Sequence, residues 1–145
     1  MNKSLHVIDM RSDTVTRPSQ RMKDVMMTCA LGDDVFGDDP TVAYMQNTMA
    51  QFFGKEAALY MPSGTQSNLV AMMVNCKNKG DSAIIGSKCH INNYERGGLA
   101  AIGSIMPTIV PNLENGTFDL DVLRSAIPPP TEHISQPTVI SLENS

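Results

Sequence analysis

Residues 57–68, with the sequence Ala-Ala-Leu-Tyr-Met-Pro-Ser-Gly-Thr-Gln-Ser-Asn, decide the fold class. The run at 57–61 predicts a short strand, and the Pro-Ser-Gly sequence at 62–64 predicts a turn. A helix is expected from Thr65 to about Cys76, because apolar residues then recur at helical spacing. A strand that passes through a glycine turn into a helix is typical of an α/β fold. The apolar face of the expected helix consists of Leu69, Met72, Met73 and Cys76.

The residues after this helix continue the alternation of strands and helices. Strands are expected at 82–86, 104–110 and 138–142, and helices at 90–101 and 119–127. Alternation at this spacing predicts a parallel, doubly wound sheet with helices on both faces. We find no internal repeat and no break in composition that would mark a second domain.

Two helices are expected before the decisive stretch. Pro18 suits the first turn of one helix, which should end by Gly32, and Asp39 suits the N-cap of a second helix that Gly54 ends. Each helix has one apolar face, which we expect to be buried. The faces consist of Met22, Val25, Met26 and Cys29 in the first helix and Met45, Met49, Phe52 and Phe53 in the second.

The composition narrows the function classes. Hydrophobic residues make up 41% of the 145 residues and charged residues 18%, as in soluble globular proteins. The net charge of -4 and the lack of a basic cluster argue against nucleic-acid binding. No apolar run approaches the roughly 20 residues of a membrane span, and the start lacks the apolar core of a secretion signal. The three cysteines have unrelated spacings that predict neither a zinc site nor a disulfide, so we expect a cytoplasmic protein.

The turn at 62–64 also has the features of a phosphate-binding site. Gly64 lets the backbone come close to a ligand, and the free N–H groups and the dipole of the following helix favour an anion. The hydroxyls of Ser63 and Thr65 can add hydrogen bonds. The same residues are also common as a simple N-cap, and this alternative stays open on the local sequence alone. Neither a Walker loop nor a G-x-G-x-x-G dinucleotide motif is present.

Further motifs give the turn a context. In order and spacing, the chain resembles the low-specificity threonine aldolases over nearly its whole length. The motifs that carry the resemblance are Met10–Thr16 with Arg17 and Pro18, Gly32–Thr41, Gly54–Ala58, Pro62–Asn68, His90, Glu95–Gly98, Gly103–Ile105 and Leu142–Asn144.

The resemblance implies a fold and an activity. The implied fold is fold type I of the pyridoxal-phosphate-dependent enzymes, a parallel doubly wound sheet that is incomplete in this chain. Residues 1–145 would supply an N-terminal arm, about 1–17, and the N-terminal part of the large cofactor-binding domain. Members of the family cleave L-threonine or L-allo-threonine, which are β-hydroxy amino acids, to glycine and acetaldehyde. The complete enzyme is expected to be a homodimer or homotetramer.

The resemblance also implies roles for individual residues. His90 would lie against the pyridine ring of pyridoxal 5'-phosphate and is the candidate catalytic base, although a lone histidine is more often a surface or core residue. Ser12 would donate a hydrogen bond to the substrate carboxylate, although alone it is an ordinary loop serine. Arg11 and Asp13 are interpreted as a structural ion pair. The implied cofactor-binding residues are Ser63, Gly64, Thr65, His90, Glu143 and Asn144.

The acidic loop at 33–39 is not interpreted as a metal site, because it lacks the ligand spacing of a calcium loop and Asp39 is better used as a cap. The resemblance suggests that the loop helps to build the active site or a subunit contact. Phe36 stands where tyrosine is common in the family, so a role that needs a hydroxyl is not carried over.

The resemblance places the lysine that binds the cofactor covalently beyond Ser145. The chain is therefore expected to be an N-terminal fragment without aldolase activity of its own. Two alternatives remain at this stage. One is a related pyridoxal-phosphate enzyme that catalyses β-elimination, and the other is a truncated, non-catalytic subunit.

Overall fold

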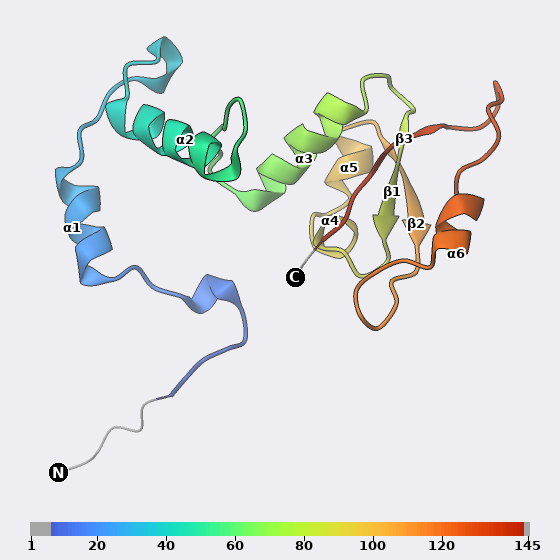
Figure 1. Cartoon of the computed structure of the whole chain (residues 1–145), viewed down its shortest axis with the longest axis horizontal. Helices are drawn as coiled ribbons and strands as arrows, with labels where there is room; N and C mark the ends of the chain where they lie inside the picture. The colour runs from blue at the N-terminus through green and yellow to red at the C-terminus, as the bar shows by residue number, and fades with distance from the viewer. Residues whose placement is uncertain (1–6, 144–145) are drawn as a thin grey trace. The chain divides into compact units, whose positions relative to one another are not determined.

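The computed structural model describes residues 7–143, and contacts divide the chain into two compact units, Met1–Tyr60 and Met61–Ser145. No helix among the described residues is both long and apolar enough to cross a membrane. In chain order the elements are η1 Asp13–Val15, α1 Gln20–Thr28, η2 Asp34–Phe36, α2 Pro40–Phe53, α3 Gly64–Asn75, β1 Ser82–Gly86, α4 His90–Asn93, α5 Gly98–Ala101, β2 Met106–Val110, α6 Leu120–Ser125 and β3 Pro137–Ile140 (Figure 1).

The first unit contains the two expected helices, and local signals set their limits. The Ser19 hydroxyl caps α1 by accepting a hydrogen bond from the Met22 N–H. Asp39 caps α2, as predicted, and Gly54 ends it in the left-handed conformation, with φ of 61°. Because Ser19 is the N-cap, Pro18 lies before α1 rather than in its first turn, where it was expected. The cap and the end of α2 were predictable because they depend on residues next to the helix ends.

The burial predicted for these helices is wrong. In α1, Met22 is 59% exposed and Met26 68%, and in α2 Phe52 and Phe53 are 75% and 66% exposed. Ala50 is the only residue of α2 in the buried class. The described part of this unit has two α-helices and no sheet, so it offers no second layer that could cover their apolar faces.

The second unit contains the predicted parallel sheet. The strand order is β2-β1-β3, and β1 pairs in parallel with both neighbours. Ser82 of β1 lies opposite Met106 of β2, and Ala83 lies opposite Val139 of β3. All five residues of β1 are buried, as expected for a central strand.

Helices cover both faces of this sheet, which confirms the doubly wound arrangement. Ala83 and Ile85 pack in a cluster with buried residues of α3, α4 and α5, whereas Ile84 packs on the other face with Val110 and Phe118 beside α6. Figure 1 shows α3, α4 and α5 on one side of the strands and α6 on the other. The connection from β1 to β2 and the connection from β2 past β1 to β3 run across the sheet in opposite directions. Crossovers of the same hand therefore need helices on opposite faces.

Two other predictions need correction. Residues 57–61 form no strand: the Tyr60 N–H bonds to the side-chain Oε1 of Gln46, and Leu59 is 70% exposed. An extended run becomes a strand only where a neighbouring strand pairs with it. Residues 90–101 form two short helices, α4 and α5, rather than one. Arg96 and Gly97 have φ of 55° and 68°, which no α-helix can accommodate.

Candidate active site

The start of α3 combines an N-cap with two free backbone donors. Ser63 has an extended backbone, and its hydroxyl accepts a hydrogen bond of 3.1 Å from the Gln66 N–H. The Ser63 carbonyl accepts a second from the Ser67 N–H. Within residues 7–143, no acceptor bonds the N–H groups of Gly64 and Thr65. The turn can therefore serve both as an N-cap and as a phosphate-binding site. Capping uses one lone pair of the Ser63 hydroxyl, and it leaves the Ser63 O–H and the N–H groups of Gly64 and Thr65 available.

Gly64 faces open space. A Cβ atom placed on Gly64 would meet nothing within 4 Å, and its φ is not in the left-handed region. Neither packing within the chain nor backbone conformation therefore requires glycine at this position. An anion held close to the backbone would require it. The exposed Ser63, Gly64 and Thr65 thus fit a phosphate group.

His90 is the first residue of α4, at the carboxyl end of β1. Its Nδ1 lies 2.8 Å from Oε1 of Glu95, and its side chain is half exposed. The Tyr94 ring lies at 5.5 Å from the imidazole, centroid to centroid, with the planes tilted by 45°. The ring is therefore anchored through Nδ1 and remains accessible to solvent.

Sequence analysis assigned no role to two residues that the structure joins to His90. The side chain of Glu95 is 4% exposed, and its Oε1 also accepts a hydrogen bond of 2.7 Å from Nδ2 of Asn68. Asn68 lies on α3, four residues after Gly64, so Glu95 connects the start of α3 to His90. The sequence signal for them was that Asn68 lies in the family motif Pro62–Asn68 and Glu95 in the family motif Glu95–Gly98. Their pairing depends on how the chain turns after α4.

Glu143 lies next to His90, and its role in binding the cofactor stays a prediction. Its Oε2 accepts a hydrogen bond of 2.8 Å from the His90 N–H. The N-cap residue of α4, Cys89, makes no side-chain capping bond, so Glu143 takes over the capping of this helix. Burial raises the pKa of the Cys89 thiol; the hydrogen bond with Gly86 lowers it, and the nearby Glu143 carboxylate raises it. Asn144 lies outside the described residues.

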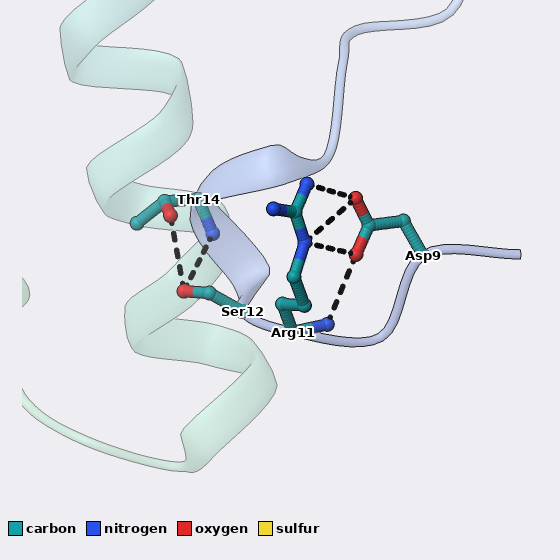
Figure 2. A network of polar contacts seen from close by, with 4 residues as sticks. All are labelled: Asp9, Arg11, Ser12 and Thr14. Carbon is teal, nitrogen blue, oxygen red and sulfur yellow. Dashed lines mark hydrogen bonds and ion pairs between the residues drawn. The ribbon is translucent and has the colours of Figure 1, made fainter.

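Ser12 belongs to the first unit and caps the short helix η1. Its Oγ accepts hydrogen bonds from the N–H and the hydroxyl of Thr14 (Figure 2). It donates one of 3.1 Å to Oδ1 of Asp13. Its O–H is thus engaged within the loop, and its contact with a substrate carboxylate stays a prediction. Ser12 would have to exchange the Asp13 bond for that contact.

The interpretation of Arg11 and Asp13 as an ion pair is wrong, because Arg11 pairs with Asp9. Its Nη2 lies 2.6 Å from Oδ2 of Asp9, and its Nε bonds both carboxylate oxygens (Figure 2). The hydrogen bond from the Arg11 side chain lowers the pKa of Asp9. The two aspartates are equally far from Arg11 in sequence, so spacing could not distinguish them.

The acidic loop is organised by Asp39. Its carboxylate accepts hydrogen bonds from the N–H groups of Thr41 and Val42 at 2.9 Å and of Gly32 at 3.1 Å. The bonds from Val42 and Gly32 are the main causes that lower the pKa of Asp39. Gly32 is needed here, since a Cβ atom would collide with the backbone of Asp38. Among the residues of the chain that the structure describes, no group of three His, Cys, Asp or Glu side chains could hold a metal ion.

Comparison with known proteins places this geometry in a family. The family model described as beta-eliminating lyase matches residues 9–145. The chain is 45% identical over 140 residues to low-specificity L-threonine aldolase 1 of Arabidopsis thaliana, covering 95% of this chain and 39% of that protein. It is also 45% identical over 139 residues to the low specificity L-threonine aldolase of Escherichia coli K12, covering 96% of this chain and 41% of that protein.

The chain therefore spans about 40% of the length of these relatives. A solved structure supports the fold alone. A proposed L-allo-threonine aldolase from Listeria monocytogenes superposes with a TM-score of 0.61 at 19% identity, over 79% of this chain and 33% of that one. The fold predicted from the resemblance is thereby confirmed.

Proposed function

The chain belongs to the beta-eliminating lyase family, and on that premise we propose that the whole protein is a pyridoxal-phosphate-dependent aldehyde-lyase. It cleaves L-threonine and L-allo-threonine to glycine and acetaldehyde. The observation that carries the proposal is the identity of 45%, over nearly all of this chain, to two proteins named as low-specificity L-threonine aldolases. The residues that the family model matches, 9–145, include the turn at 62–64, here called the phosphate turn, and His90.

The start of α3 holds the phosphate of the cofactor in this proposal. The N–H groups of Gly64 and Thr65 donate to it, and the hydroxyls of Ser63 and Thr65 add further donors. The positive end of the α3 dipole favours its charge. When bound, pyridoxal phosphate supplies an electron sink for the pair released by the breaking Cα–Cβ bond.

His90 removes the proton from the β-hydroxyl of the substrate. The atom that accepts this proton is Nε2, because Nδ1 is already bonded to Glu95. The side chain of His90 is half exposed, so it is accessible to a ligand. Glu143 holds the backbone of His90 in place through its N–H, and Ser12 binds the substrate carboxylate.

The remaining features of the proposal concern the whole protein. Threonine catabolism with formation of glycine is its metabolic role, the cytoplasm is its location, and a homodimer or homotetramer is its assembly. Light scattering on the full-length protein would measure the number of subunits directly.

The products of the reaction test the proposal against its rivals. Full-length protein supplied with pyridoxal phosphate and L-threonine should release acetaldehyde and glycine in equal amounts. Release of ammonia instead would assign the protein to β-elimination, and release of neither would favour a non-catalytic chain. His90→Phe keeps a flat ring but removes the base, so it should bind the cofactor and lose acetaldehyde release. His133→Phe, at an exposed position, is the matched control.

A further inference from the structure

Glu95 is a buried carboxylate with an unusual set of partners. Its side chain is 4% exposed, and no lysine or arginine among residues 7–143 forms an ion pair with it. Its partners are instead Nδ1 of His90 at 2.8 Å and Nδ2 of Asn68 at 2.7 Å, and both contact the same oxygen, Oε1. Burial of a carboxylate without a cation is costly unless hydrogen bonds offset it. The arrangement is therefore maintained against a cost in stability.

The two hydrogen bonds determine where the proton of His90 lies. An ionised carboxylate only accepts hydrogen bonds, so Nδ1 of His90 must donate and carry the hydrogen. In the neutral ring the other nitrogen, Nε2, then has a free lone pair. Free imidazole side chains in water favour the opposite form, with the hydrogen on Nε2. Glu95 thus imposes the minor tautomer, in which Nε2 carries the free acceptor.

Asn68 gives the carboxylate a second connection. It lies one turn after Gly64 on α3, so its bond to Oε1 fixes Glu95 relative to the helix that begins at the phosphate turn. Because the same oxygen bonds His90, the direction of the imidazole ring is set by α3 as well as by α4. The phosphate turn and the base are therefore positioned by one buried carboxylate.

We propose that Glu95 is a positioning residue, which holds His90 in the Nδ1–H tautomer and, through Asn68, aligns it with the start of α3. The proposal rests on the proposed function for the use that is made of Nε2, but the tautomer itself is a property of this chain. Glu95 does not touch the substrate or the cofactor in this account. It acts only through His90.

Nitrogen NMR on protein labelled with ¹⁵N-histidine measures the tautomer without cofactor or substrate. In an alkaline sample, which favours neutral imidazole rings, His90 should carry its hydrogen on Nδ1. Exposed His133 should show the opposite, predominantly Nε2–H form and serves as the internal reference. A wild-type His90 with its hydrogen on Nε2 would overturn the proposal without any variant.

Two substitutions separate positioning from simple packing. Glu95→Leu fills a similar volume but removes the acceptor, so His90 should revert to the Nε2–H form. Glu95→Gln keeps an oxygen that both donors can reach, so the Nδ1–H form of His90 should persist in this variant. This measurement remains informative if Glu95→Leu does not fold. A folded Glu95→Leu protein with an unchanged tautomer, or a Glu95→Gln protein that loses the tautomer, would contradict the assigned role.

Activity of the full-length protein gives an independent readout. A general base contributes about 10²–10⁴-fold to rate, so Glu95→Leu should lower kcat about 100-fold while KM for threonine changes little. Glu95→Gln should recover most of this loss. An equal loss in both variants, or an effect confined to KM, would count against positioning. If the tautomer is as predicted but wild-type protein releases no acetaldehyde, the proposed function fails and the role of Glu95 in setting the tautomer stands.

Discussion

Gly86, at the carboxyl end of the central strand, is the position where one added methyl group should disturb the site most. A Cβ atom there would lie 2.7 Å from Nδ2 of Asn112 and 2.8 Å from the Cys89 sulfur. Asn112 cannot easily move away, because its Oδ1 accepts the Lys88 N–H at 2.9 Å and its Nδ2 donates to the Gly116 carbonyl at 3.2 Å. Gly86→Ala should therefore displace a side chain that orders the segment leading to His90.

The expected cost can be built from these contacts. Overpacking in a well-packed region costs about 1–3 kcal/mol, and each lost hydrogen bond about 0.5–1.5 kcal/mol. Gly86→Ala should then lower the free energy of unfolding by roughly 2–4 kcal/mol. Asn112→Ala, which loses the two hydrogen bonds without a collision, should cost about 1–3 kcal/mol.

A double-mutant cycle tests whether the two effects share one cause. Removing the Asn112 side chain makes room for the new methyl group, so the double variant should be about 1–2 kcal/mol more stable than the sum of the single costs. Urea unfolding of the four proteins, with unchanged m values, provides the measurement. Costs that add within about 0.5 kcal/mol would show that the collision with Asn112 does not cause the loss.

Three further predictions concern charge and the phosphate turn. The hydrogen bonds from Val42 and Gly32 lower the pKa of Asp39 in the folded protein. They therefore stabilise the first unit at pH values above the ordinary carboxyl pKa of about 3.9. This stabilisation is lost as the pH falls through the lower pKa of the folded state. Asp39→Asn should therefore flatten the loss of helical circular dichroism below about pH 4, and parallel acid curves for the two proteins would refute this. Burial raises the pKa of the Cys89 thiol, so its contribution to stability is complete below the ordinary thiol pKa of about 8.5 and is lost as the pH rises through the higher folded pKa. From pH 7 to pH 10, the urea midpoint of unfolding should then fall further for the wild-type protein than for Cys89→Ala. An equal fall in the two proteins would exclude the Cys89 thiol as the cause. Thr65→Ala should weaken binding of pyridoxal phosphate more than it lowers the free energy of unfolding, while Thr65→Ser, which keeps the hydroxyl, should restore affinity; if both variants bind like wild type, the hydroxyl makes no contact with the phosphate.

The features that sequence could predict are those that local chemistry determines. Asp39 and Ser63 cap their helices because each side chain reaches N–H groups only two or three residues away. The apolar run at 82–86 is buried on both faces, as a central parallel strand requires. The helices and the sheet followed from these signals, whereas phosphate binding at the turn of residues 62–64 stays a prediction.

The features that sequence could not predict depend on partners that lie elsewhere in the chain. Helical periodicity identified the apolar face of α1 but not whether anything covers Met22 or Met26. The run at 57–61 has the composition of a strand but no strand to pair with. Glu95 follows His90 by five residues, which is not a helical contact spacing, and the two meet because α4 ends at Asn93 and the chain turns.

Gly64 offers a direct test of anion binding at the start of α3. A methyl group at Gly64 would meet no atom of the chain within 4 Å, so Gly64→Ala should fold normally. Gly98→Ala is the matched control, because Gly98 also begins a helix and also faces open space. A charged hydrogen bond contributes about 1.5–3 kcal/mol, so loss of one donor should be visible as tenfold or more in affinity.

The decisive measurement is the affinity for pyridoxal phosphate relative to pyridoxal, which lacks the phosphate. It is made on three full-length proteins: the wild type, Gly64→Ala and Gly98→Ala. We expect Gly64→Ala to reduce this preference about tenfold or more while Gly98→Ala leaves it unchanged, because only the first removes room for the anion. A preference that is the same in all three proteins would mean that the amides of Gly64 and Thr65 do not bind the phosphate.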